Sequence, residues 1–186
     1  MTDNERLAEL LFPNISWTPQ QYEEQYPARQ LPEGARVTRF SPSPTGYLHI
    51  GGLFAAMTAR LTAKATSGVF FLRIEDTDKK REVEGGVTAI VTGLAAFGIT
   101  PDEGITGLGT ESGVYGPYQQ SKRREIYQCF AKELVRQGLA YPCFCTEAEL
   151  TALREQQEAQ AVNKGYYGEW AACRNLAFCE QKQAVE

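Results

Sequence analysis

The sequence has a single histidine among 186 residues, and it has no apolar run long enough to span a membrane. Its first ten residues are acidic and mixed, so they do not resemble a secretory signal. Five cysteines without an export signal indicate reduced thiols or metal ligands rather than a disulfide framework. These scarcities exclude a membrane-spanning protein and a small disulfide-stapled domain, and we expect a globular, cytoplasmic chain.

The net charge of −4 is small and unevenly placed. Residues 1–34 carry two basic and six acidic side chains, so the rest of the chain is balanced. This body contains two basic clusters, at residues 79–81 and 122–124. Such clusters are more often solvated faces than binding sites. A neutral total still allows a nucleic-acid partner, because binding follows a local patch.

Apolar periodicity predicts alternating strands and helices from residue 37 onward. The expected strands are 37–41, 69–74 and 139–145. The expected helices are 5–12, 52–68, 83–99, 121–138 and 146–160, with Gly68 as a C-cap, Ser121 as an N-cap and a Thr146–Glu149 capping box. Residues 98–118 are rich in glycine and predict an irregular loop. This order predicts an α/β fold with a Rossmann-like, doubly wound parallel sheet.

The stretch "RFSPSPTGYLHIGG", Arg39 to Gly52, joins the first expected strand to the helix after it. In such sheets, ligands bind beyond the carboxyl ends of the strands. Free N–H groups and the positive end of the helix dipole at His49-Ile50-Gly51-Gly52 suit a phosphate. An imidazole there could stabilise charge on a transferring phosphoryl group. The alternative is a plain strand-to-helix turn with a solvated histidine.

The second expected strand ends in "RIEDTD", which places Glu75, Asp76 and Asp78 close together. One carboxylate facing the crevice could hold an ammonium group, as an arginine at a strand end could hold a carboxylate. The alternative is that these acids cap the next helix and pair with the basic residues 79–81. We favour the substrate role for Glu75 and the alternative for Asp76 and Asp78.

These strings together resemble a known family. "RFSPSPTGYLHIGG" and "FFLRIEDTDKKR" resemble the signature blocks of class I aminoacyl-tRNA synthetases in their glutamyl form, and "GPYQQSKRREIYQ" and "LAYPCFCTEAELTALREQQ" resemble the segments that follow. The resemblance runs from residue 37 to at least residue 174. It implies that glutamate attacks the α-phosphorus of ATP, with Mg2+ as cofactor, to give glutamyl-adenylate and release pyrophosphate. The glutamyl group then passes to the terminal adenosine of tRNA.

The resemblance also implies roles for individual residues. His49 matches a catalytic position, and Gly52 stands where the family often has histidine. The implied ATP contacts are Pro42, Thr45, Gly46, His49, Gly51 and Gly52. The implied glutamate contacts are Arg39, Ser41, Ser43 and Glu75. The acceptor end of tRNA is expected to meet Lys122 and Arg123.

The expected organisation has three parts. Residues 1–36 form an amino-terminal extension, residues 37–140 the first half of the catalytic domain, and residues 141–186 the start of an insertion that binds the acceptor stem. The family's downstream K-x-S-K-like loop and its anticodon-binding domain do not occur in this sequence. We therefore expect a monomeric fragment that does not charge tRNA alone. A glutamyl-queuosine tRNA(Asp) synthetase and a non-catalytic nucleotide-binding module are the alternatives, and a glutaminyl enzyme fits less well.

Four cysteines raise the question of zinc. Cys143 and Cys145 form a C-x-C pair, and Cys173 and Cys179 follow later. Some members of the family hold zinc near this position, but Asn175 stands where they have a ligand. Tyr166, Tyr167 or Cys179 would have to complete the four-coordinate set that a structural zinc site needs. The sequence therefore favours buried reduced thiols over a metal site, and zinc stays an alternative.

Overall fold

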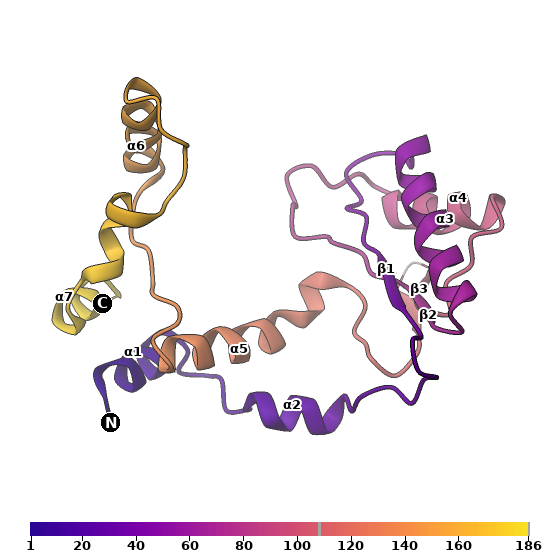
Figure 1. Ribbon diagram of the computed structural model, residues 1–186, viewed down its shortest axis with the longest axis horizontal. Coiled ribbons are helices and arrows are strands. Elements are labelled where there is room, and N and C mark those ends of the chain that lie inside the picture. The colour runs from indigo at the N-terminus through magenta and orange to yellow at the C-terminus, as the bar shows by residue number, and fades with distance from the viewer. Residues whose placement is uncertain (108, 186) are drawn as a thin grey trace. The chain divides into compact units, whose positions relative to one another are not determined.

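The computed structural model describes residues 1–107 and 109–185 (Figure 1). Its contacts divide the chain into two compact units. The first, here called the sheet unit, is residues 20–126, and the second, here called the cysteine unit, combines residues 1–19 with residues 127–186. This division differs from the boundaries expected at residues 36 and 140. The reason is that the amino-terminal helix packs with the carboxyl-terminal one instead of standing as a separate extension.

The sheet unit is built on four strands in the order β1-β2-β3-β4. The first three run parallel, with Phe40 opposite Leu72, and the fourth runs antiparallel to the third. The strands are β1 (Val37–Phe40), β2 (Val69–Leu72), β3 (Glu103–Gly107) and β4 (Thr110–Ser112). Helix α3 (Ile50–Ala65) joins β1 to β2, and α4 (Gly86–Ala96) joins β2 to β3. The expected α/β fold with a parallel sheet is confirmed.

The apolar core of this unit lies between the sheet and its two helices. Phe70 and Leu72 are fully buried and share one face of β2, because alternate residues of a strand point the same way. They pack with Ile90 and Leu94 of α4 and with Ala56 of α3. The core therefore fixes the ends of β1 and β2, where the predicted ligand residues begin.

The expected irregular loop at 98–118 is wrong in part, because it contains β3 and β4. Gly104 explains the error. Its φ is +120°, and a β-carbon at this position would lie 2.1 Å from the carbonyl oxygen of Leu72. Only glycine lets the two strands approach here, so β3 cannot show the run of β-branched residues that marks a strand.

Two predicted helix caps are also wrong. Helix α3 ends at a C-cap on Thr66, and Gly68 is needed for a different reason: a β-carbon there would lie 1.9 Å from the carbonyl oxygen of Arg36. Ser121 is not an N-cap, because it lies inside a short 3₁₀ helix, η1 (Gln120–Arg123), that precedes α5 (Arg124–Arg136). The roles of Gly68 and Ser121 depend on contacts with distant residues, which a local sequence pattern does not reveal.

Several side-chain contacts connect residues 26–29 to the sheet. Arg29 forms a two-point ion pair with Glu103, and its guanidinium lies 3.7 Å from the centre of the Tyr115 ring. The Tyr118 hydroxyl donates to Glu103 at 2.7 Å. The hydrogen bond from Arg29 holds the pKa of Glu103 below its ordinary value, whereas burial and Glu103 raise the pKa of Tyr118 to about 12. Residues 26–29 therefore belong structurally to the sheet unit.

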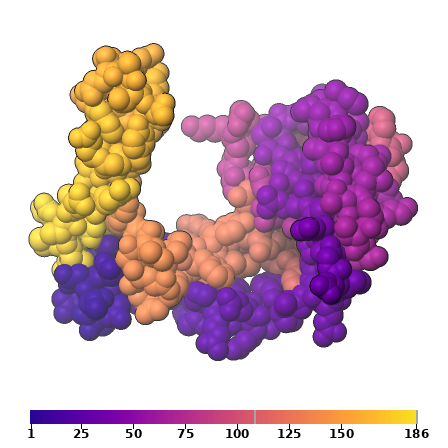
Figure 2. Space-filling view, viewed as in Figure 1, coloured from indigo at the N-terminus to yellow at the C-terminus, as the bar shows by residue number. Residues whose placement is uncertain are grey.

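The cysteine unit is mostly helical. Its helices are α1 (Asp3–Leu11), α5, α6 (Glu147–Ala159) and α7 (Phe178–Val185), with 3₁₀ turns η2 (Gly168–Trp170) and η3 (Ala172–Asn175), and α2 (Pro19–Gln25) begins at its border. Figure 2 shows the indigo amino-terminal residues against the orange and yellow residues near the carboxyl end. The predicted helices at 5–12 and 146–160 and the Thr146–Glu149 capping box are confirmed.

The strand expected at 139–145 is wrong, because this segment pairs with no other strand in the described part of the chain. It is an extended connection whose thiols face residues 166–173. The run "LAYPCFC" looks apolar and strand-like in sequence, but its Phe144 amide meets the Cys173 sulfur, and its Cys145 thiol meets the Cys173 sulfur and the Tyr166 hydroxyl. Across the described residues, no helix is both long and apolar enough to cross a membrane.

Candidate active site

Most residues of the signature stretch line one cavity of about 440 Å³ in the sheet unit. The cavity opens where the loop after β1 turns into α3. It is lined by the predicted residues Pro42, Ser43, Thr45, Gly46, His49 and Gly52. It is also lined by Phe40, Tyr47, Leu48 and Ile90, which no polar motif in the sequence marked. Arg39, Ser41, Gly51 and Glu75 lie outside this lining.

His49 is the N-cap residue of α3. Its Nδ1 accepts a hydrogen bond from the backbone N–H of Gly52 at 3.4 Å, and its ring is exposed. Gly51 leaves room for that ring, because a β-carbon there would lie 3.1 Å from His49 Nδ1. The imidazole therefore replaces one missing helical partner of the first turn and keeps its other nitrogen, Nε2, available.

The signature loop is held by the segment that follows β2. The backbone N–H of Glu75 donates to the Pro42 carbonyl at 3.0 Å, and that of Val83 donates to the Pro44 carbonyl at 2.9 Å. Gly86 closes this contact, because a β-carbon on it would lie 3.0 Å from the Pro44 carbonyl oxygen. The proline-punctuated loop is thus fixed from outside, by partners that its own sequence does not reveal.

Glu75 and Arg73 form an ion pair at the end of β2, with 3.1 Å between Arg73 Nη2 and Glu75 Oε1. Both side chains are partly buried, and Arg73 was not anticipated as a partner. The two residues are two apart in an extended segment, so their side chains share one face. Arg39, also predicted to meet glutamate, is exposed on β1.

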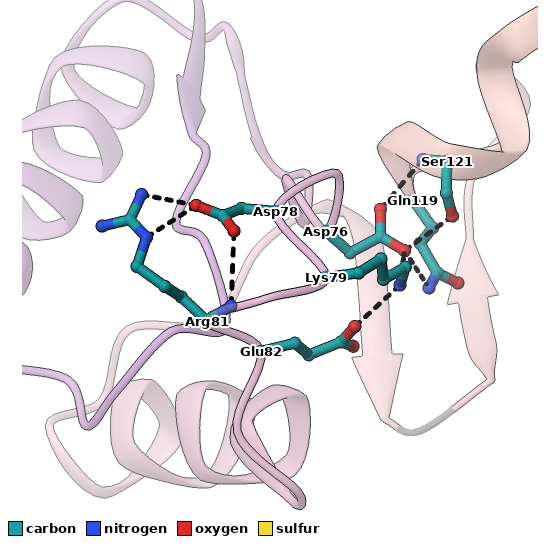
Figure 3. A network of polar contacts seen from close by, with 7 residues as sticks. All are labelled: Asp76, Asp78, Lys79, Arg81, Glu82, Gln119 and Ser121. Carbon is teal, nitrogen blue, oxygen red and sulfur yellow. Dashed lines mark hydrogen bonds and ion pairs between the residues drawn. The ribbon is translucent and has the colours of Figure 1, made fainter.

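Asp76 is only 1% exposed and forms the polar centre of the loop after β2 (Figure 3). It accepts hydrogen bonds from the Ser121 amide at 2.9 Å, the Ser121 hydroxyl at 2.6 Å and the Gln119 side chain at 2.8 Å. Burial alone would raise the pKa of Asp76. The hydrogen bonds from Ser121 and Gln119, with one from Lys79, outweigh it and lower the pKa to about 2.

The ion pairs predicted for Asp76 and Asp78 are confirmed with Lys79 and Arg81. Lys79 Nζ lies 3.2 Å from Asp76 Oδ2 and 2.7 Å from Glu82 Oε2. Arg81 Nη2 lies 2.6 Å from Asp78 Oδ2. The hydrogen bond from Arg81 keeps the pKa of Asp78 below its ordinary value. The predicted helix cap is not seen, since α4 begins at an N-cap on Gly85.

The two residues predicted to meet tRNA differ in their surroundings. Arg123 is half-buried, and its Nη1 donates to the carbonyl oxygens of Tyr115 at 3.3 Å and Pro117 at 2.8 Å. It therefore holds the loop before η1. Lys122 is exposed beside it. Contact with tRNA stays a prediction for both.

Three of the cysteines form a cluster in the cysteine unit. The sulfur atoms of Cys143, Cys145 and Cys173 all lie within 4.8 Å of one another, and those of Cys145 and Cys173 are 3.7 Å apart. Tyr166 completes the cluster, with its hydroxyl 3.5 Å from the Cys145 sulfur and accepting from the Cys173 amide at 2.9 Å. Cys179 is exposed and lies outside the cluster.

The cluster perturbs its own ionisable groups. Burial raises the pKa of Tyr166. Burial would also raise the pKa of Cys173, but hydrogen bonds from Tyr166 and from the Phe144 amide favour the thiolate and lower it. Sequence reasoning named Tyr166 only as one of three residues that could complete a set. The cluster depends on a fold in which residues 143–145 and 166–173 meet, and the spacing alone does not show this.

Comparison with known proteins agrees with these features. A family model described as tRNA synthetases class I (E and Q), catalytic domain, matches residues 36–184. The chain is 52% identical to a glutamate–tRNA ligase of Clostridium perfringens over 182 residues, which is 98% of this chain and 33% of that protein. It is 51% identical to the ligase of Acetivibrio thermocellus, over 99% of this chain and 34% of the relative. The chain therefore spans about a third of the length of these relatives.

A solved structure is also similar. The glutamate–tRNA synthetase of Elizabethkingia anophelis superposes with a TM-score of 0.70 at 39% sequence identity. The match covers 82% of this chain and 31% of that one.

Proposed function

Because the chain belongs to the class I tRNA synthetase family of the glutamate and glutamine type, we propose that it carries the ATP- and glutamate-binding part of a glutamate–tRNA ligase. The observation that carries this proposal is the cavity at the start of α3, lined by six of the residues expected to bind substrates. The names of the relatives favour this function over the queuosine enzyme and over a non-catalytic module. We further propose that it acts as a monomer in the cytoplasm.

His49 is proposed to contact the phosphates of ATP. Its Nδ1 accepts from Gly52, so the proton of the neutral imidazole belongs on Nε2. That N–H donates to a phosphate oxygen, next to the positive end of the α3 dipole. As glutamate attacks, negative charge grows on the phosphoryl oxygens, and a donor fixed in advance stabilises it. Mg2+ supplies further charge neutralisation when it accompanies ATP.

Glutamate is proposed to lie between the ends of β1 and β2. Glu75 offers a carboxylate for the ammonium group of the amino acid, while the fork of Arg39 suits a carboxylate, with Ser41 and Ser43 beside it. The ion pair with Arg73 fixes one of the two oxygens of Glu75. Lys122 and Arg123 are proposed to face the acceptor end of tRNA, where cations stabilise the backbone.

The cysteine cluster fits zinc, and we propose that Cys143, Cys145, Cys173 and Tyr166 hold it. A tetrahedral site with Zn–S bonds of about 2.3 Å places two ligand sulfurs about 3.8 Å apart. The sulfurs of Cys145 and Cys173 are 3.7 Å apart, which matches this geometry. A bound ion would crosslink the 143–145 segment to the 166–173 segment. Its role in this closed set of ligands would be structural rather than catalytic.

Calorimetry with two ligands tests the substrate proposal. ATP probes the His49 end of the site, and a non-hydrolysable glutamyl-adenylate analogue probes both ends. Replacing His49 by alanine should weaken both ligands about tenfold, because a hydrogen bond to a charged phosphate is lost. Glu75→Ala should weaken the analogue by a similar factor of about ten and leave ATP unchanged.

Lys80→Ala is the matched control, because Lys80 is exposed in the same loop. It should bind both ligands like the wild-type chain. If His49→Ala and Glu75→Ala also bind both ligands like the wild type, the site assignment is wrong.

A further inference from the structure

The segment 73–76 is held from both sides, like a central strand, although β2 ends at Leu72. On one side, the amides of Arg73 and Glu75 donate to the carbonyls of Phe40 and Pro42, each at 3.0 Å. On the other side, Ile74 forms a parallel bridge with Gln119. Its amide donates to the Tyr118 carbonyl at 3.0 Å, and its carbonyl accepts from the Gln120 amide at 2.8 Å. Glu75 therefore sits between the signature loop and residues 118–120.

Asp76 closes the second of these contacts. Its buried carboxylate accepts one hydrogen bond from Gln119, which forms the bridge, and two from Ser121, which lies two residues later (Figure 3). Each is a hydrogen bond to a charged group with little access to water, which is the stronger class of hydrogen bond. Lys79 adds a fourth contact, but its side chain is 61% exposed and contributes little.

We infer that Asp76 is a positioning residue for the glutamate site, holding Glu75 in register with the signature loop by anchoring residues 74–76 to Gln119 and Ser121. Successive side chains of an extended segment alternate, so Asp76 points away from the face that carries Glu75 and does not touch the ligand. Its effect passes through the backbone. What Glu75 binds rests on the proposed function, whereas the anchoring rests on the hydrogen bonds.

The same loop contains a natural comparison. Asp78 lies two residues further on, and its ion pair with Arg81 spans only three positions on the surface. Among the described residues, the side-chain hydrogen bonds and ion pair of Asp78 stay within this loop. Neutralising Asp78 removes a charge of the same kind from the same loop without touching the anchor, so Asp78→Asn is the matched control for Asp76→Asn. Ser121→Ala weakens the anchor from its other end, far from Glu75 in sequence.

The test combines amide hydrogen exchange with calorimetry on the purified chain. In Asp76→Asn, exchange at the Glu75 and Gln120 amides should rise at least about tenfold, as expected when charged hydrogen bonds are lost locally. Exchange at Phe70 and Leu72 in the core should stay unchanged. The analogue should bind about tenfold more weakly and ATP within about twofold of wild type. Ser121→Ala should act in the same direction with a smaller effect, and Asp78→Asn should change nothing.

The outcomes separate two failures. Unchanged exchange at Glu75 in Asp76→Asn overturns the inference, as does an increase that extends to Phe70 and Leu72, because that marks general destabilisation. Equal weakening of ATP and analogue also overturns it. If exchange rises locally but the wild-type chain binds the analogue no better than Glu75→Ala does, the glutamate site fails while the anchor stands. The double variant Asp76→Asn/Ser121→Ala should lose less than the sum of the two single losses, because Ser121 is one of the partners of Asp76.

Discussion

The two units of the molecule hold their chemistry-bearing side chains in different ways. In the sheet unit, His49 and Glu75 follow strands whose direction and register are fixed by the apolar core of Phe70, Leu72, Ile90 and Leu94. In the cysteine unit, the apolar cluster is small, built on Leu7, Ala8 and Val135. In the described part of the chain, its clustered thiols lie on the segments 143–145 and 172–175, neither of which is a strand.

Buried polar contacts hold the segments that carry the thiols. Gln157 is fully buried and exchanges two hydrogen bonds with the backbone of Gly165, which shapes the loop before Tyr166. Cys173 is buried against the Tyr166 hydroxyl. Such contacts define a geometry but add little net stability, because they replace hydrogen bonds to water. The structure of the sheet unit is thus stabilised mainly by apolar burial. That of the cysteine unit depends on the contacts that link its segments around the thiols.

The largest predicted effect is that of removing the proposed zinc ion, which should affect the cysteine unit and not the sheet unit. We expect one zinc ion per chain by mass spectrometry of metals, and Cys145→Ser should lose it. Structural zinc contributes roughly 10 kcal/mol to small metal-dependent folds, so the cysteine unit should lose its protected amides while the sheet unit keeps them. Cys179→Ser is the control, because Cys179 is exposed and outside the cluster. The zinc proposal is contradicted if the wild-type chain contains no metal and the variants Cys145→Ser and Cys179→Ser melt at the same temperature.

A glycine substitution tests the other side of the comparison. Gly104→Ala should destabilise the sheet unit by about 3 kcal/mol, since the added carbon meets the Leu72 carbonyl and the residue must keep a positive φ. Gly98→Ala is the matched control, with φ at +67° but open space around it, and should cost about 1 kcal/mol. Urea unfolding followed by circular dichroism gives both values. Equal losses would mean that the contact with β2 is not what requires glycine at position 104.

The contrast between units also explains what the sequence could predict. Helices and strands with a local signature, such as α3 after the signature loop and α6 with its Thr146 capping box, were predicted nearly to their ends. Six of the ten residues around the cavity were also named, because the signature stretch is continuous in sequence. These features depend on interactions within a few residues, so a pattern can carry them.

What the sequence did not show depends on contacts between distant segments. Strand β3 was missed because glycine is required at position 104 for close approach to Leu72 of β2. Residues 139–145 were misjudged because Phe144 and Cys145 contact the Cys173 sulfur instead of a neighbouring strand. The anchor of Asp76 on Ser121 spans 45 positions. Its Lys79 ion pair was predicted because it spans only three. Side chains that act across the fold need the structure, even when the motif beside them is evident.

The smallest predicted effect concerns the cap of α6 in the cysteine unit. The Thr146 hydroxyl accepts from the Glu149 amide, and the Glu149 carboxylate accepts from the Thr146 amide. Thr146→Ala should cost about 1 kcal/mol, measured by thermal unfolding of the metal-loaded chain, because a helix end loses one of its few partners. Thr151→Ala, inside the same helix, should be neutral or slightly stabilising, since alanine favours the helix. If Thr146→Ala melts with the wild type, the segments joined by the proposed zinc ion, rather than helix α6, limit the stability of this unit.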